Sequence, residues 1–115
     1  MAYILAVGIN RYANQDYDLK YAVPDAEALA AELHRQQVRL RTFADVRTVV
    51  LRDAEATRDN ILRAFRRLSG NESGSVPAGV PPQIERLAAA RVDDTVFVYF
   101  AGHGSAQGEV RSEGV

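Results

Sequence analysis

The sequence predicts one small α/β domain built on a mainly parallel sheet. Apolar runs of strand length occur at residues 3–9, 46–51 and 95–101, and stretches with helical spacing of apolar residues separate them. Strands that alternate with helices form parallel sheets with right-handed crossovers. At 115 residues the chain is long enough for a single domain. Three strands make a small sheet, so we expect residues 1–115 to be the N-terminal part of a larger domain.

The first strand and the first helix follow from the first third of the chain. Residues 3–9 form an apolar run that predicts a central strand. Pro24 and Asp25 predict the start of a helix, because proline suits the first turn and an acidic residue there complements the helix dipole. We expect this helix to continue to about His34, whose imidazolium would complement the dipole at the other end. The apolar positions of this helix are Ala26, Leu29, Ala30 and Leu33.

The middle of the chain predicts a second strand and a second helix. Residues 46–51 read Val-Arg-Thr-Val-Val-Leu, which is typical of a strand. Thr57 predicts the N-cap of a helix. The composition then changes to Ser, Gly, Pro and Asn, which predicts a loop or insertion at residues 69–86, and a short helix is expected at 84–90. The apolar face of the second helix consists of Ile61, Leu62, Phe65 and Leu68.

The third strand leads directly into the most informative motif. Residues 95–101 are an uninterrupted apolar run, which predicts a strand buried on both faces. Gly102, His103 and Gly104 follow at the strand's carboxyl end, where α/β sheets bind their ligands. A histidine there can move a proton at neutral pH, and the Gly104 amide can approach a developing oxyanion. The alternative is that His103 is a turn residue with an exposed ring.

Composition excludes several classes of function. The chain has 14 basic and 15 acidic residues and a net charge of −1, so nothing indicates nucleic acid or an anionic membrane as a partner. We interpret Arg63, Arg66 and Arg67 as a solvated helix face. No apolar run approaches the roughly 20 residues that span a bilayer. The absence of cysteine excludes disulfides, thiolate metal sites and a cysteine nucleophile within the chain. Without a basic leader, we expect a cytoplasmic protein.

Four motifs together resemble those of a known enzyme family. They are Tyr-Ile-Leu-Ala-Val-Gly-Ile-Asn at residues 3–10, Asp-Leu-Lys-Tyr-Ala-Val-Pro-Asp-Ala at 18–26, Thr-Arg-Asp-Asn-Ile at 57–61, and Val-Tyr-Phe-Ala-Gly-His-Gly at 98–104. In this order the chain resembles the caspase-like cysteine peptidases, and the metacaspase and bacterial caspase-homologue branch in particular. The resemblance implies a caspase-like three-layer fold, of which these residues form the large-subunit portion.

The same resemblance implies a histidine–cysteine dyad. His103 matches the family's catalytic histidine, and Gly104 would hold the oxyanion. The family's nucleophilic cysteine lies on the next strand, in a segment that these 115 residues do not contain. The implied partners are therefore a cysteine-bearing remainder of the domain, or a small-subunit chain, and a protein or peptide substrate. The alternative is a catalytically silent caspase-like module used for binding or regulation.

The resemblance also implies a specificity residue. An aspartate matching Asp25 helps to form an acidic S1 pocket for arginine or lysine in metacaspase-like members. The alternative for Asp25 is a purely structural role in the first helical turn. No cofactor and no resident metal are expected. We interpret Asp16 and Asp18 as solvated turn formers; the alternatives are that they widen the acidic rim or bind calcium, so calcium activation stays open.

Overall fold

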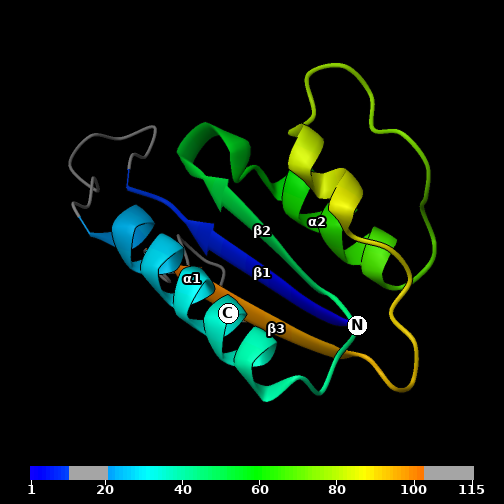
Figure 1. Ribbon diagram of the computed structural model, residues 1–115. Helices are drawn as coiled ribbons and strands as arrows, with labels where there is room; N and C mark the ends of the chain where they lie inside the picture. Colours follow the sequence, from blue (N-terminus) through cyan, green and yellow to red (C-terminus); the bar gives the residue numbers. More distant parts are fainter. Residues whose placement is uncertain (11–20, 103–115) are drawn as a thin grey trace, which may run out of the picture.

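The computed structural model describes residues 1–10 and 21–102. Its described sheet contains β1 (Ala2–Gly8), β2 (Val46–Arg52) and β3 (Thr95–Ala101). These strands lie in the order β2-β1-β3, and both neighbouring pairs are parallel. The α/β class and the parallel sheet predicted from the sequence are therefore confirmed (Figure 1).

Helices cover both faces of this sheet. The α-helix α1 (Ala22–Leu40) packs on one face, and α2 (Arg58–Leu68) packs on the other (Figure 1). The 3-10 helix η3 (Pro82–Arg86) lies on the same face as α2, and the short η2 (Asp53–Glu55) follows β2 directly. The described residues thus form three layers with the sheet in the middle.

The core forms around β1, in which every residue is buried. Alternate side chains of a strand point to opposite faces, so β1 contributes to two apolar clusters. On the α1 face, Ile4 and Ala6 pack with Ala26 and Ala30. The cluster on the other face is larger and consists of Tyr3, Leu5, Val7, Val49, Leu51, Ala56, Ala64, Leu68, Ile84 and Leu87.

Two local predictions have different outcomes. Thr57 is the N-cap of α2, and its Oγ1 accepts a hydrogen bond from the Asn60 backbone N–H at 3.1 Å, as the sequence predicts. The prediction of a short helix at residues 84–90 is wrong. The helical turn is η3, which begins at Pro82, and Leu87 is already extended with ψ at 131°. Proline fixes φ at a value that suits the first turn of a helix, so the helical turn begins at Pro82, two residues before the predicted start.

The prediction that β3 is buried on both faces is also wrong. Phe97 and Tyr99 pack against the cluster under α1. Val96, Val98 and Phe100 lie on the other face and stay 38%, 52% and 49% exposed. Among the described strands β3 is at the edge of the sheet, and α2 and η3 leave this part of its surface partly uncovered.

The edge formed by β2 is covered by polar side chains. Gln83 Nε2 donates to the Val50 carbonyl at 3.1 Å, and an Arg86 guanidinium nitrogen donates to the Thr48 carbonyl at 3.0 Å. Both donors belong to η3. These contacts satisfy outward-facing carbonyls that would otherwise be open to another strand.

Arg67 corrects the interpretation of the helix arginines as solvated. Its side chain is buried, with the residue 4% exposed. The guanidinium donates hydrogen bonds to the carbonyls of Leu87 at 3.0 Å, Gly74 at 2.8 Å and Glu85 at 3.4 Å. Arg67 therefore holds the segment between α2 and β3 against α2.

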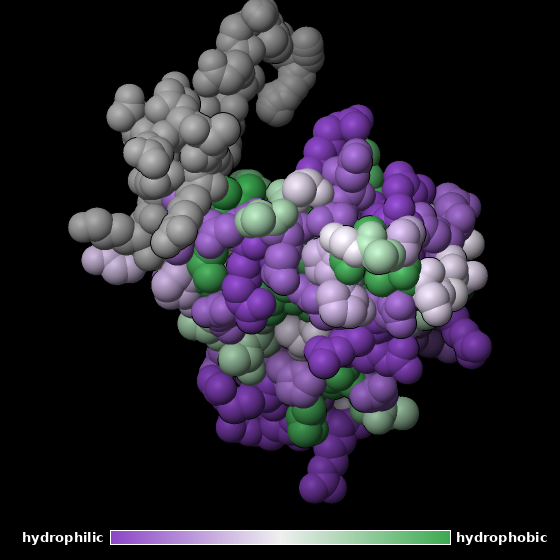
Figure 2. All heavy atoms as spheres, turned by 90° about the horizontal axis from the view of Figure 1, so that it is seen from above, coloured by the Kyte–Doolittle hydropathy of each residue, from purple (hydrophilic) through white to green (hydrophobic). Residues whose placement is uncertain are grey.

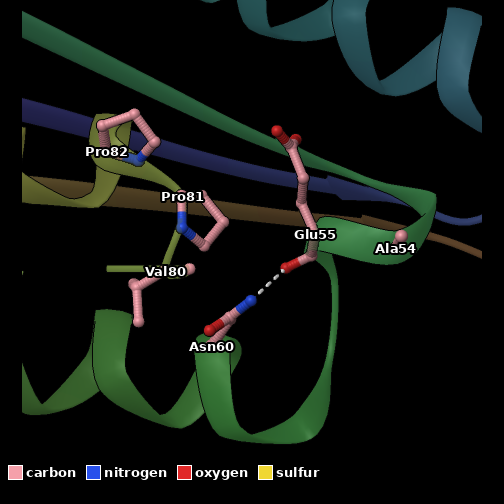
Figure 3. Close-up of a pocket in the computed structure, with 7 residues that line it drawn as sticks. Ala54, Glu55, Asn60, Val80, Pro81 and Pro82 are labelled. Atoms are coloured by element: carbon pink, nitrogen blue, oxygen red, sulfur yellow. Dashed lines mark hydrogen bonds between the residues drawn. The ribbon is translucent and has the colours of Figure 1, made fainter. Parts of the chain in front are cut away.

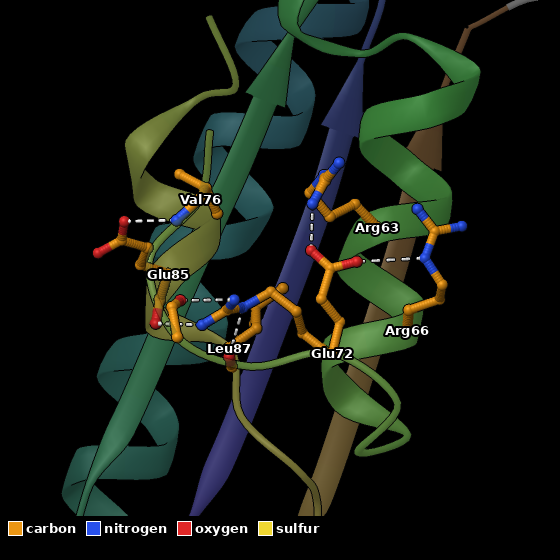
Figure 4. Close-up of polar contacts among 8 residues, drawn as sticks. Arg63, Arg66, Glu72, Val76, Glu85 and Leu87 are labelled. Carbon is orange, nitrogen blue, oxygen red and sulfur yellow. Dashed lines mark hydrogen bonds and ion pairs between the residues drawn. The ribbon is translucent and has the colours of Figure 1, made fainter. Parts of the chain in front are cut away.

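Arg63 and Arg66 bind the same segment through Glu72. Each guanidinium is hydrogen-bonded to one carboxylate oxygen of Glu72 (Figure 4). Partial burial raises the pKa of Glu72, but the hydrogen bonds from Arg66 and Arg63 outweigh it, so the pKa lies below its usual value of 4.5. The two arginines make this face an ion-pair network.

Asp94 joins the beginnings of β1 and β3 and makes stability sensitive to acid. Its carboxylate accepts from the Arg91 backbone N–H at 2.8 Å and pairs with the Met1 amino group at 3.1 Å. These interactions hold the pKa of Asp94 below its usual value of 3.8. A lowered folded-state pKa stabilises the fold above the unfolded-state value, and this contribution is lost as the pH falls through the folded-state pKa.

Asp94→Asn should therefore lower the melting temperature at neutral pH. Below about pH 4 the melting temperature of this variant should fall less steeply than that of the unmodified protein. Melting temperatures of both proteins measured from neutral to acidic pH check this. Parallel pH curves for the two proteins would show that Asp94 makes no linked contribution.

One face of the molecule is mostly polar. Seen from above, the molecule is largely hydrophilic, with hydrophobic residues in small separate patches (Figure 2). Within residues 1–10 and 21–102, no helix has the length and apolar character needed to cross a membrane.

Candidate functional site

The carboxyl ends of the described strands meet at one edge of the sheet. Gly8, at the end of β1, is in register with Arg52 of β2 and with Ala101 of β3. The next residue, Ile9, donates its backbone N–H to the Ala101 carbonyl at 3.0 Å. This is the edge at which open parallel sheets bind ligands, so the structure defines where a site would be built.

Asn10 connects this edge to the beginning of α1. Its backbone N–H donates to Asp53 Oδ1 at 2.7 Å, and its side-chain Oδ1 accepts from the Val23 backbone N–H at 3.0 Å. Tyr21, at the N-cap position, supplies no side-chain cap. Asn10 therefore acts as the cap for α1 from a distance in sequence and fixes the helix N-terminus against the ends of β1 and β2.

Gly8 allows α1 to approach the sheet closely. A Cβ at this position would lie 2.9 Å from Val23 Cα and 3.0 Å from the Ala22 carbonyl oxygen. Both contacts are with backbone atoms, which cannot rotate away as a side chain does. The glycine is thus required by the contact between the end of β1 and the first turn of α1.

Asp25 lies in that first turn and is exposed. Its carboxylate makes no ion pair or hydrogen bond with the described part of the chain. The next acidic residue of α1, Glu27, instead pairs with Arg52. The structure therefore places the Asp25 carboxylate near the carboxyl edge of the sheet, without an ion-pair partner among residues 1–10 and 21–102.

The other predicted site residues lie outside the described residues. His103 and Gly104 follow Gly102, the last described position, and Asp16 and Asp18 fall in the range 11–20. The structure thus places Asp25 near the edge at which β3 ends. The relative position of Asp25 and His103 stays a prediction.

His34 has a structural role, but for a different reason from the one expected. The helix continues to Leu40, so His34 is not in its last turn, where the basic residue is Arg39. Instead, His34 Nδ1 lies 2.8 Å from Thr48 Oγ1 and joins α1 to β2. No group of three or more potential metal ligands occurs within residues 1–10 and 21–102.

A pocket of about 450 Å³ lies away from these residues, between η2, the start of α2 and the chain before η3 (Figure 3). Asn60 closes one wall by donating its side-chain amide to the Glu55 carbonyl at 2.9 Å. The pocket contains none of the predicted site residues. Its lining consists of Ala54, Glu55, Asn60, Gly79, Val80, Pro81 and Pro82.

No protein-family model matches the chain, and no curated protein or solved structure matches it either. The resemblance to caspase-like peptidases therefore rests on the motifs at residues 3–10, 18–26, 57–61 and 98–104.

Proposed function

We propose that this chain is the histidine-bearing part of a caspase-like cysteine endopeptidase that acts in the cytosol and cleaves after arginine or lysine. The observation that carries the proposal is the Asp25 carboxylate near the carboxyl edge of the sheet, which has no ion-pair or hydrogen-bond partner among the described residues. The strand that ends there, β3, is followed two positions later by His103. An acidic group and a titratable histidine at one sheet edge suit hydrolysis next to a basic side chain.

In the proposed mechanism, the nucleophile comes from a cysteine-bearing segment that completes the domain. His103 takes the proton from the thiol, and the thiolate attacks the peptide carbonyl carbon. The Gly104 N–H stabilises the resulting oxyanion. His103 then gives its proton to the leaving amine, and water hydrolyses the thioester. These steps use no cofactor.

Asp25 supplies specificity in this proposal. A carboxylate can accept two parallel hydrogen bonds from a guanidinium, and it also attracts an ammonium group. The contacts of Asn10 and Gly8 with α1 fix the backbone of the turn that carries Asp25. With the backbone already fixed, only side-chain freedom of Asp25 is lost when the substrate binds.

Asp25→Asn should lower kcat/KM for arginine and lysine substrates by about one to two orders of magnitude, because a charge-assisted hydrogen bond is lost. The effect should fall mainly on KM. The measurement compares kcat/KM for matched peptides with arginine, lysine or aspartate before the cleaved bond, using the completed enzyme.

Glu27→Gln is the matched control, because it removes a negative charge from the same helix two residues later. It should leave the substrate preference unchanged. If Asp25→Asn lowers the melting temperature and does not alter the preference among the three substrates, then Asp25 is a helix-start residue without a role in specificity.

A further inference from the structure

Asp53 has an unusual backbone conformation at the carboxyl edge of the sheet. It follows β2 directly, and its φ is 48°. Among the described residues, Arg41 is the other non-glycine residue with a positive φ, and it lies after the last residue of α1, where a left-handed residue commonly ends a helix. Asp53 begins the short helix η2 rather than ending one, so its conformation needs another reason. Sparsely populated conformations of this kind are found most often at functional sites.

The side chain of Asp53 binds the segment that leaves β1. Its Oδ1 accepts the Asn10 backbone N–H at 2.7 Å, a short distance that is typical of hydrogen bonds to a carboxylate. The last paired residues of the two strands are Gly8 and Arg52. The bond therefore joins the carboxyl ends of β1 and β2 just beyond the end of their ladder, and the left-handed backbone of Asp53 is part of the turn that makes this contact.

Asn10 connects this carboxylate to α1. Its side-chain Oδ1 accepts the Val23 backbone N–H at 3.0 Å. Val23 lies in the first turn of α1, two residues before Asp25, whose own N–H donates to the Tyr21 carbonyl at 2.8 Å. Two successive hydrogen bonds thus link the Asp53 carboxylate to the helical turn that carries Asp25.

We propose that Asp53 is a positioning residue for substrate specificity, because through Asn10 it holds the turn from which Asp25 meets the basic side chain of the substrate. This inference rests on the proposed function. Asp53 itself does not contact the substrate in this arrangement. The alternative is that the link only stabilises the fold, in which case its loss would lower the melting temperature and leave the kinetics of the folded enzyme unchanged.

The test replaces Asp53 by glycine in the enzyme completed by its cysteine-bearing segment. Glycine adopts a φ of 48° without strain, so the turn after β2 is retained and the carboxylate is removed. Asp53→Gly should raise KM for arginine and lysine peptides by about three- to tenfold and leave kcat nearly unchanged, because it weakens the binding of substrate and transition state alike.

The conservative variant Asp53→Asn should restore most of the unmodified KM. Its side-chain oxygen can still accept from the Asn10 N–H, and asparagine tolerates a positive φ. Arg41→Gly is the matched control, because it also replaces a left-handed residue by glycine but lies at the opposite end of α1. It should leave KM unchanged.

A double-mutant cycle shows whether Asp53 acts through Asp25. In an Asp25→Ala background, Asp53→Gly should have no further effect on KM for basic peptides, because the group that it positions is gone. Amide hydrogen exchange at Val23 gives a result that does not depend on activity. Protection of this amide should fall in Asp53→Gly and persist in Asp53→Asn, since Asn10 is held in place only in the second variant.

The outcomes separate this inference from the proposed function. If Asp25→Asn weakens the binding of basic peptides but Asp53→Gly does not, the inference is wrong and the proposed function stands. An equal rise in KM with and without Asp25, or unchanged protection of Val23 in Asp53→Gly, also overturns the inference. If the unmodified enzyme cleaves no basic peptide, the proposed function fails and this inference fails with it.

Discussion

In the enzyme completed by its cysteine-bearing segment, His103→Ala should lower kcat/KM for peptide hydrolysis by about 10²–10⁴-fold. The loss is large because one imidazole both accepts the thiol proton and donates to the leaving amine. His103 follows the end of β3, and a loop residue at a strand end contributes little to a core, so the melting temperature should change little. Turnover of an arginine peptide and a thermal melt measured on the same preparation check both expectations.

His34→Gln is the matched control, since His34 is the only other histidine in the chain and bonds Thr48. It should retain turnover. Near-normal hydrolysis by folded His103→Ala would remove His103 from the mechanism. If the unmodified enzyme, with its cysteine present, hydrolyses no arginine or lysine peptide, the catalytically silent binding module becomes the better explanation of the fold.

The elements of this fold could be predicted because their signals are local. The apolar run of β3 gives its limits, Thr95–Ala101, directly, and Thr57 marks the start of α2. The exposure of β3 could not be predicted in this way. An uninterrupted apolar run indicates a strand, but which strand becomes central depends on pairing across the chain. Here β1 took that position and left Val98 half exposed.

The link between Asn10 and Asp53 was missed for a similar reason. The two residues are 43 positions apart, and no local pattern joins them. The sequence offers one signal, an aspartate directly after a strand. Asp53 has a φ of 48° in the structure, and aspartate tolerates this left-handed conformation better than most residues do, so it is compatible with a sharp turn. Its contact with Asn10 becomes visible only once the strands are ordered.

Arg67 was misinterpreted because its partners are backbone carbonyls. Its four-residue spacing from Arg63 is typical of a solvated basic helix face. Every residue carries a backbone carbonyl, so the sequence does not show which carbonyls will accept from Arg67. The burial of Arg67 depends instead on the path of residues 74–87. That path brings three carbonyls to one guanidinium, whose planar fork of donors suits them.

Arg67→Ala should lower the free energy of unfolding by about 2–3 kcal/mol, because it leaves buried carbonyls without donors. Arg67→Lys should recover only part of this loss, since an ammonium group cannot reproduce the fork. Arg66→Ala is the control: Arg66 is also in α2, but its side chain is 46% exposed and, among the described residues, is hydrogen-bonded to Glu72 alone. Its loss should cost less than about 1 kcal/mol.

Urea unfolding of the four proteins measures these differences, and amide hydrogen exchange locates them. Because Arg67 holds the segment before β3 against α2, protection in Arg67→Ala should fall first around Ile84 and Leu87, which belong to the cluster under α2. Protection in β1 and α1 should fall only to the extent that global stability falls. If Arg67→Ala and Arg66→Ala unfold at the same urea concentration, the three carbonyl contacts contribute nothing measurable, and apolar packing of Ile84 and Leu87 alone holds the segment.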